Sequence, residues 1–329
     1  MEGNINEKIT KAMLVNKENL INIKWVIKQI KNAINNNEKI IKHANEIDKK
    51  NNNGFILDFN IINNIFNNIE KEKIIYKNVT LSQKDNEKKI IYGRQIMDIG
   101  NVVVINDGNP YIIVEMILRN ILAGNSTIFA NNGFMYGTNN LLVQIVQSIL
   151  EQCNISKYLI QIHITENYDE ILSNYSNIDL VICIADHSLQ TLILKKSKVK
   201  TIVSGYENFD LYIEDATHLD LIDKIINTKL NIQIYINNNI KLNYDNAIYV
   251  DDIDEAIAKI NYNGNKYSSS IFTASPNNAS KFIKEVKSKI VTVNTSPTIE
   301  RIIDIKQNDL VNEKTIIYPL TFKFSKNNK

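Results

Sequence analysis

Cysteine is nearly absent from this sequence, which has only Cys153 and Cys183 among its 329 residues. Two thiols exclude a disulfide framework and a cysteine-rich zinc site. Histidine is also scarce, and no two of the four histidines have the i, i+4 spacing of a helical metal pair. We therefore expect no metal site.

Long hydrophobic runs and an excess of one charge are missing as well. No run approaches the roughly 18 consecutive apolar residues of a membrane helix, and no apolar signal core follows basic residues at the N-terminus. The 38 basic and 36 acidic residues give a net charge of +2 and are well mixed. Nothing in this balance favours nucleic acid or a membrane as a partner, so we expect a soluble, cytoplasmic protein.

The pattern of apolar residues predicts helices first and then alternating strands and helices. Ile23, Ile27, Ile30 and Ile34 recur at helical spacing in the N-terminal third. From residue 100 onward, short β-rich runs alternate with helical stretches, which is typical of a parallel sheet covered on both faces. Gly124 is placed to end one of these helices.

A second, smaller strand–helix series runs over residues 246–293. Asp252 is placed to cap a helix carrying Ala256, Ile257 and Ile260, and Ser275 with Pro276 suits the start of the next helix. Residues 315–324 alternate enough to form an edge strand or one exchanged with a partner.

The sequence thus predicts an α/β fold with a doubly wound parallel sheet and a second, reduced α/β lobe. We expect N-terminal helices and a dinucleotide-binding-type domain over residues 1–212. A reduced catalytic-type domain over 213–300 and a C-terminal tail over 301–329 would follow.

Three stretches in register resemble gamma-glutamyl phosphate reductase and its aldehyde dehydrogenase relatives. They are residues 101–132, with VINDGNP and a later GN; residues 179–229, with TIVSG and LYIED; and residues 251–296, with DEAI and VTVNTS. The resemblance covers about two-thirds of the chain and implies an aldehyde dehydrogenase-like, Rossmann-like fold. It also implies NADP binding by the first domain and, in the second, a cysteine that attacks an acyl phosphate, a task suited to a thiolate.

The nucleophile is where this sequence departs from the family. The resemblance places the cysteine shortly after an Asn-Ala-Lys stretch, which matches Asn227, Thr228 and Lys229, but residues 230–254 contain no cysteine. Cys183 lies in an apolar run, where burial would make its thiol inert. Cys153 lies near a helix C-terminus, where the helix dipole disfavours a thiolate. We therefore expect no catalytic residue.

The cofactor contacts implied by the family are also weakened. The stretch matching the family's ribose-phosphate lysine, residues 130–135, has no cation, and no GxGxxG occurs in the chain. The glycine-rich turn is replaced by a segment in which Asp186 is a good helix N-cap, and its carboxylate would repel a phosphate. Asp186, His187 and Ser188 mark a helix start, because consecutive residues cannot form a catalytic relay.

The remaining candidate site residues come from loops that match the family's cleft. The expected cofactor-binding residues are Asn106, Asn109, Pro110, Ser204 and Gly205. The expected substrate-binding residues are Asn294, Ser296 and Arg301. For the asparagines, a competing interpretation is that they are turn residues bonding their own backbone.

The leading hypothesis is a shortened gamma-glutamyl phosphate reductase-like protein without the catalytic cysteine, a pseudoenzyme that serves as a binding or oligomer partner. It would form a homo-oligomer or pair with a full-length relative, through the tail strand near residues 316–318. Two alternatives remain: an active NADPH-dependent reductase of gamma-glutamyl phosphate in proline biosynthesis, and a structural or assembly protein.

Overall fold

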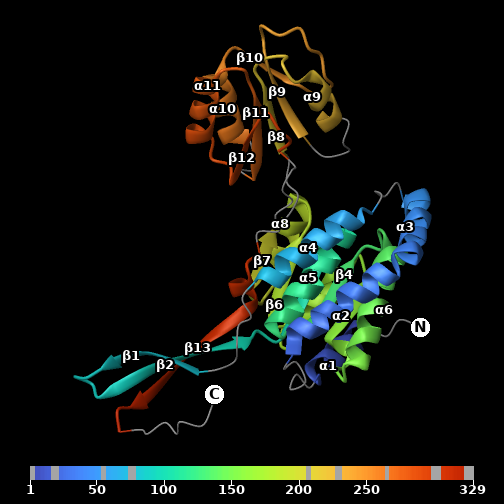
Figure 1. Cartoon of the computed structure of the whole chain (residues 1–329), viewed down its shortest axis with the longest axis vertical. Coiled ribbons are helices and arrows are strands. Elements are labelled where there is room, and N and C mark those ends of the chain that lie inside the picture. The colour runs from blue at the N-terminus through green and yellow to red at the C-terminus, as the bar shows by residue number, and fades with distance from the viewer. Residues whose placement is uncertain are drawn as a thin grey trace. The chain divides into compact units, whose positions relative to one another are not determined.

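The computed structural model describes residues 4–15, 22–52, 57–72, 79–204, 209–226, 232–263, 267–297 and 305–321. The chain forms two compact units (Figure 1). Unit 1 comprises residues 1–205 and 303–329, and unit 2 comprises residues 206–302.

Unit 1 is built on a five-stranded parallel sheet with the order β5-β4-β3-β6-β7. The strands are β3 (Asn101–Asn106), β4 (Ser126–Asn131), β5 (Ile160–Ile164), β6 (Leu180–Ile184) and β7 (Thr201–Ser204). Every residue of β3, β4 and β6 is buried. Strands covered on both faces read as near-continuous apolar runs, which explains the β-rich runs in the sequence.

Helices cover both faces of this sheet. They are α1 (Ile5–Met13), α2 (Ile23–Asn36), α3 (Glu38–Asn52), α4 (Phe59–Lys71), α5 (Pro110–Ala123), α6 (Tyr136–Gln152), α7 (Tyr168–Ser173) and α8 (His187–Lys196). Helices α1, α7 and α8 share one core with alternate residues of β3, β4 and β6, while α5 is buried along almost its whole length. The expected stripe on α2 is confirmed at Ile27, Ile30 and Ile34, and Gly124 ends α5 with a φ of 81°.

Unit 1 also carries a three-stranded antiparallel sheet with the order β1-β2-β13. Its strands are β1 (Val79–Asp85), β2 (Ile90–Asp98) and β13 (Val311–Pro319), and a short 3-10 helix, η3 (Gln307–Leu310), leads into β13. The tail thus forms an edge strand that pairs with β2 of its own chain. Residues 322–324 of the expected strand lie outside the described residues.

Unit 2 is a second parallel sheet, with the order β10-β9-β8-β11-β12. It comprises β8 (Phe209–Ile213), α9 (Leu219–Ile226), β9 (Ile232–Asn237), β10 (Ile248–Val250), α10 (Ile253–Asn263), β11 (Ser268–Phe272), α11 (Pro276–Glu285) and β12 (Ile290–Val293). The predicted starts of α10 and α11 are confirmed. The side chain of Asp252 accepts from the Glu255 amide at 2.9 Å, and Ser275 accepts from the Asn278 amide.

The expected domain boundary after residue 212 falls inside β8, a strand of the second sheet. Strand–helix alternation continues unbroken across residues 200–230, so the periodicity does not mark where the chain leaves the first sheet. The tail expected as a separate segment from residue 301 belongs to unit 1 from residue 303. Among the described residues, no helix combines the length and apolar character that crossing a bilayer requires.

Candidate functional site

The carboxyl edge of the first sheet is where a ligand site would be built. The chain runs from β3 to β4 on one side and places β6 on the other side of β3, so the strand order reverses between β3 and β6. Ligands of open α/β sheets bind outside the carboxyl ends of the strands at such a point. The loops after β3, β4 and β6 are therefore the segments of interest.

The loop after β3 holds three of the expected cofactor-binding residues. The Asn106 carboxamide oxygen accepts from the Gly108 amide at 2.6 Å. Asn109 caps α5 by accepting from the Tyr111 amide at 3.0 Å, and Pro110 occupies the first turn of that helix. The two asparagine oxygens thus bond backbone amides two residues further along the chain, as Asx turns do.

The loops after β3 and β4 are in direct contact. Gly108 has a φ of 88°, and a Cβ on it would lie 2.2 Å from the Phe134 carbonyl oxygen. Asn139, in the first turns of α6, donates from Nδ2 to the carbonyl oxygens of Gly108 at 2.6 Å and Phe134 at 3.4 Å. One carboxamide thereby holds the two loops together over the edge of the sheet.

Three buried asparagines leave polar atoms free at this edge. Asn106 and Asn131 are in register on β3 and β4, and both, like Asn139, are 0% exposed. The Asn131 oxygen accepts from the Gly133 amide at 3.0 Å. Asn106 Nδ2, Asn131 Nδ2 and Asn139 Oδ1 have no hydrogen-bond partner among the described residues, so the two nitrogens can donate to, and the Asn139 oxygen can accept from, a water or a small polar ligand.

Asp186 occupies the N-terminus of α8, as the sequence predicted. Its Oδ1 accepts from the Leu189 amide at 2.9 Å and from the Ser188 hydroxyl at 2.6 Å. A helix N-terminus attracts phosphate through free amides and a partial positive charge. Here a carboxylate already uses that position.

A second carboxylate closes the N-terminus of α6. Asp48, which comes from α3 and is 8% exposed, accepts from the amides of Gly137 at 3.1 Å and Thr138 at 2.7 Å. The Thr138 hydroxyl adds a bond of 2.7 Å. Met135, the N-cap residue itself, makes no side-chain capping bond. Asp48 lies about 90 residues before the helix that it caps, so local sequence pattern gives no sign of this contact.

Two of the helix N-termini at this edge do not fit a dinucleotide phosphate. The N-terminus of α5 is capped by the neutral Asn109, whereas those of α8 and α6 are capped by Asp186 and Asp48. Residues 130–135, which end β4 and form the loop after it, contain no cation. A phosphate brought to either helix would meet a carboxylate, which repels it.

The two thiols lie in unit 1. Cys183, on β6, is 0% exposed within the core formed with α1, α7 and α8, and this burial, with a smaller contribution from Asp186, raises its pKa to about 12. Cys153 follows α6 as its half-buried C-cap residue, and burial also raises its pKa. A thiol with a raised pKa is protonated at neutral pH and is a poor nucleophile.

The expected substrate-binding residues belong to unit 2, but Arg301 lies outside the described residues. Asn294 has a φ of 52° and brackets Thr273, accepting from its amide at 2.9 Å and donating to its carbonyl at 3.0 Å. Ser296 lies in a segment whose carbonyls at Thr295 and Pro297 accept from serine hydroxyls of β11. Of the expected cofactor residues, Ser204 ends β7, while Gly205 lies outside the described residues.

A carboxylate pair joins the end of β8 to the start of α11 at the carboxyl edge of the second sheet. Glu214 accepts from Asn278 Nδ2 at 2.6 Å and from the Thr273 hydroxyl, and Asp215 accepts from the Ala274 amide. The sequence analysis did not single out these residues. Within the described part of the chain, no group of three or more His, Cys, Asp or Glu side chains is arranged to hold a metal ion.

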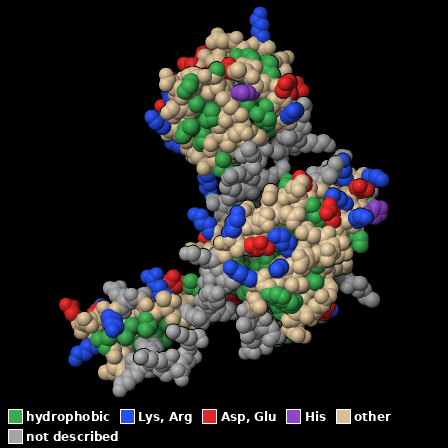
Figure 2. Space-filling view, in the orientation of Figure 1, with side chains coloured by type: hydrophobic (Ala, Val, Ile, Leu, Met, Phe, Trp, Pro, Cys, Tyr) green, Lys and Arg blue, Asp and Glu red, His purple; other side chains and the backbone are tan. Residues whose placement is uncertain are grey.

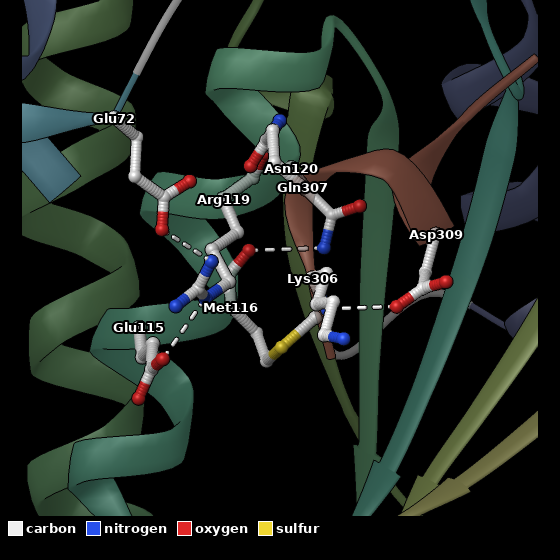
Figure 3. Close-up of polar contacts among 8 residues, drawn as sticks. All are labelled: Glu72, Glu115, Met116, Arg119, Asn120, Lys306, Gln307 and Asp309. Atoms are coloured by element: carbon white, nitrogen blue, oxygen red, sulfur yellow. Dashed lines mark hydrogen bonds and ion pairs between the residues drawn. The ribbon is translucent and has the colours of Figure 1, made fainter. Parts of the chain in front are cut away.

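The most buried ion pair of unit 1 lies away from this edge, on α5 (Figure 3). Arg119 is 2.7 Å from Glu72 and 2.9 Å from Glu115, and its side chain is 13% exposed. Gln307 donates to the Arg119 carbonyl at 3.2 Å, which ties the η3 segment to α5. Burial raises the pKa of Glu115, and the neighbouring guanidinium opposes that effect. The charge of Arg119 is thus balanced by Glu72 and Glu115, and its backbone carbonyl binds the C-terminal segment through Gln307.

Sequence comparison finds relatives that share the name gamma-glutamyl phosphate reductase. The chain is 22% identical to gamma-glutamyl phosphate reductase of Petrotoga mobilis over 262 residues, which is 63% of this chain and 63% of that protein. It is 24% identical to the enzyme of the same name from Dictyoglomus thermophilum over 339 residues, covering 82% of this chain and 81% of that protein. The chain thus matches less than two-thirds of the length of the Petrotoga relative. No family model matches it.

Solved structures show the same relationship at the level of fold. Gamma-glutamyl phosphate reductase of Thermotoga maritima has a TM-score of 0.67 at 16% identity, covering 98% of this chain and 100% of that one. Glyceraldehyde-3-phosphate dehydrogenase of Methanocaldococcus jannaschii, solved in complex with NADP, has a TM-score of 0.74 at 14% identity, covering 95% and 94%. The chain therefore has the aldehyde dehydrogenase fold, and its curated relatives are gamma-glutamyl phosphate reductases.

Proposed function

We propose that this chain is a non-catalytic, gamma-glutamyl phosphate reductase-like protein that works as a binding or oligomer partner. The proposal rests on where the two cysteines lie in the chain. The full sequence has no cysteine in residues 206–302, and the two thiols of unit 1 have raised pKa values. An acyl-transfer step through a thioester needs a thiolate that can reach the substrate.

The proposal also includes the loss of NADP binding. Asp186 and Asp48 support this, because each places a carboxylate at a helix N-terminus of the cofactor-type sheet. The M. jannaschii neighbour, in contrast, was solved with NADP bound. We expect the dinucleotide to bind this chain weakly or not at all.

The proposed partner is a second copy of the chain or a full-length relative, bound through the three-stranded sheet. Among the described strands, β13 pairs only with β2 and therefore lies at the edge of this sheet. Large apolar side chains on both outer strands are exposed: Val79 by 39%, Leu81 by 45% and Ile317 by 58%. Figure 2 shows hydrophobic side chains gathered on the visible face of this sheet. An exposed edge with apolar neighbours suits strand pairing with another chain.

Two experiments test the proposal. The first is a fluorescence titration with NADPH combined with an assay of NADPH-dependent reduction of gamma-glutamyl phosphate, on the unaltered chain and on Cys153→Ala and Cys183→Ala. We expect no saturable binding and no turnover. Turnover that is abolished by either alanine substitution would favour the second candidate function, an active reductase of proline biosynthesis. That candidate is supported by the names of the relatives, which are gamma-glutamyl phosphate reductases.

The second experiment measures mass by sedimentation, for the chain alone and mixed with a full-length gamma-glutamyl phosphate reductase. We expect a dimer or larger assembly that Ile317→Lys disrupts. Tyr262→Lys, which also introduces a lysine in place of a large exposed side chain but in unit 2, where Tyr262 is 90% exposed, is the control. A monomer under both conditions would contradict the proposed partner.

A further inference from the structure

A buried carboxamide lies where the three-stranded sheet joins the rest of unit 1. Asn125 follows Gly124, the residue that ends α5, and directly precedes β4. Its side chain is 0% exposed. Because it lies at the amino end of β4, it is separate from the candidate site, which lies at the carboxyl ends of the strands.

Asn125 bonds the segments next to two strands of the three-stranded sheet. Its Oδ1 accepts from the amides of Ile99 at 2.9 Å and Gly100 at 3.2 Å, directly after β2. Its Nδ2 donates to the carbonyl of Leu310, directly before β13, at 2.9 Å. The last residue of β2 is paired with the first residue of β13. One side chain thus holds both strands at the point where they leave the core.

Every hydrogen-bonding position of this carboxamide is used. The second N–H of Asn125 donates to Asn120 Oδ1 at 3.1 Å. Asn120 is also 0% exposed and donates to the Met116 carbonyl of α5 at 2.9 Å. A carboxamide offers two lone pairs on its oxygen and two N–H donors, so an aspartate or an aliphatic side chain could not replace it. A buried polar group with all its bonds made is rigid.

Neighbouring bonds hold one strand each. The Ser126 amide donates to the Gly100 carbonyl at 2.9 Å, which supports the segment after β2. Gln307 donates to the Arg119 carbonyl at 3.2 Å (Figure 3), which supports the segment before β13. Loss of the Asn125 side chain would therefore leave both segments attached but no longer fixed to each other through one group.

We infer that Asn125 is a positioning residue for the three-stranded sheet. It fixes the direction in which β2 and β13 leave the core of unit 1, and so presents the sheet to its partner. The partner rests on the proposed function, whereas the positioning is a property of the single chain and is measured without a partner.

Distances between two spin labels in one chain test the positioning. Asn86, in the turn between β1 and β2, and Gln144, on α6, are both exposed. Asn86→Cys and Gln144→Cys are labelled in a Cys153→Ser chain, in which the remaining Cys183 is buried, and are diluted with unlabelled chain. Double electron–electron resonance measures the distribution of distances. We expect Asn125→Ala to about double the width of this distribution, because both strands lose a shared rigid contact.

The matched control is Asn120→Ala, which removes a carboxamide of equal burial that bonds neither strand. We expect its distribution to keep the width of the unaltered chain. Asn125→Asp retains the shape and the bonds from Ile99 and Gly100 but loses the donor to Leu310, so it should also broaden the distribution. It replaces Asn125→Ala if circular dichroism shows that variant to be unfolded. An unchanged width in the Asn125 variants, or equal broadening in Asn120→Ala, would overturn the inference.

Sedimentation of the same variants without labels tests whether the positioned sheet serves the partner. We expect Asn125→Ala to assemble more weakly than Asn120→Ala. Equal assembly of the two variants would overturn the role of Asn125 in presenting the sheet. An unaltered chain that stays monomeric would contradict the proposed function, and the label distances would still decide whether Asn125 positions the sheet.

Discussion

Two buried aspartates, one in each unit, are accommodated in opposite ways. Asp48 is 8% exposed and accepts three hydrogen bonds at the start of α6. Asp210, on β8, is 1% exposed, and its one recorded hydrogen bond comes from the Ser269 hydroxyl at 3.5 Å. A buried carboxylate needs donors or a cation to remain charged. Unit 1 supplies donors, whereas in unit 2 burial raises the pKa of Asp210 to about 7.

The neighbours of Asp210 explain its raised pKa. The core on its face of the sheet is apolar, with Ala256, Ile257 and Ile260 from α10, Phe282 from α11 and Val286, the residue that follows α11. Tyr235 is the titratable group whose own pKa, raised mainly by burial to about 12, also responds to Asp210. Asp48 is therefore held by donors from another helix, whereas burial favours the protonated form of Asp210.

The largest expected effect comes from removing the cation of the most buried ion pair in unit 1. Arg119→Met leaves Glu72 and Glu115 close together without their guanidinium, and we expect it to lower the free energy of unfolding by about 3 kcal/mol. Urea denaturation measures the change. Lys31→Met, which breaks a more exposed pair with Glu70, is the control and should cost less than about 1 kcal/mol. An equal loss in the free energy of unfolding for the two variants would show that burial does not determine how much these ion pairs stabilise the fold.

Asp210 is expected to make unit 2 less stable as the pH rises. Its folded pKa of about 7 lies above the ordinary value of 3.8. The folded state therefore holds the proton more tightly, and the stabilisation is complete below pH 4 and lost as the pH rises through 7. Between pH 5 and pH 8 we expect a loss of about 2 to 3 kcal/mol, measured by pulse proteolysis with cleavage mapped to residues 206–302.

The control for this effect is a neutral side chain of the same shape. Asp210→Asn should abolish the pH dependence and unfold at pH 8 with a higher free energy than the unaltered chain. Asp245→Asn, at an exposed position of the same unit, should leave the dependence unchanged. An unaltered pH dependence in Asp210→Asn would assign it to another group.

Asp48→Asn should lower the free energy of unfolding at neutral pH, whereas Asp210→Asn should raise it. The amides of Gly137 and Thr138 donate to different oxygens of Asp48. Asparagine replaces one of these oxygens by an NH2 group that faces a donor, so we expect a loss of about 1 to 2 kcal/mol in the free energy of unfolding. Asp58→Asn is the control, because Asp58 caps α4 through a single bond at an exposed site, and asparagine is an equally good N-cap. An equal loss in the free energy of unfolding for Asp48→Asn and Asp58→Asn would show that the number of hydrogen-bond donors to the capping carboxylate does not affect stability.

The smallest effect concerns the rate at which the thiols react. Cys183 is fully buried and Cys153 half-buried, so we expect a disulfide reagent to label one thiol per folded chain slowly and both in urea. Cys153→Ser should remove the reaction of the folded chain, and Cys183→Ser should leave it unchanged. Rapid labelling of Cys183 in the folded chain would contradict its burial.

Local sequence pattern was sufficient for much of the fold. The stripe on α2, the glycine that ends α5 and the caps of α8, α10 and α11 follow from residues within one or two turns of each other. The boundary between the units did not follow, because β8 looks like one more strand of the first series. Asn139 and Glu214 were missed for a related reason, since Asn139 binds the Gly108 carbonyl and Glu214 binds Asn278, which lie in other elements.

The sequence by itself determined which segments form helices and strands, where many helices begin, and that sulfur is missing from the second unit. Those properties depend on side-chain period, short-range capping and composition. Only the tertiary structure decided which charges are matched and which helix ends are closed. Asp48 meets α6, and Arg119 meets Glu72, through contacts between elements distant in the chain, and hydrogen bonding and ion pairing depend on distance in space rather than on order in sequence.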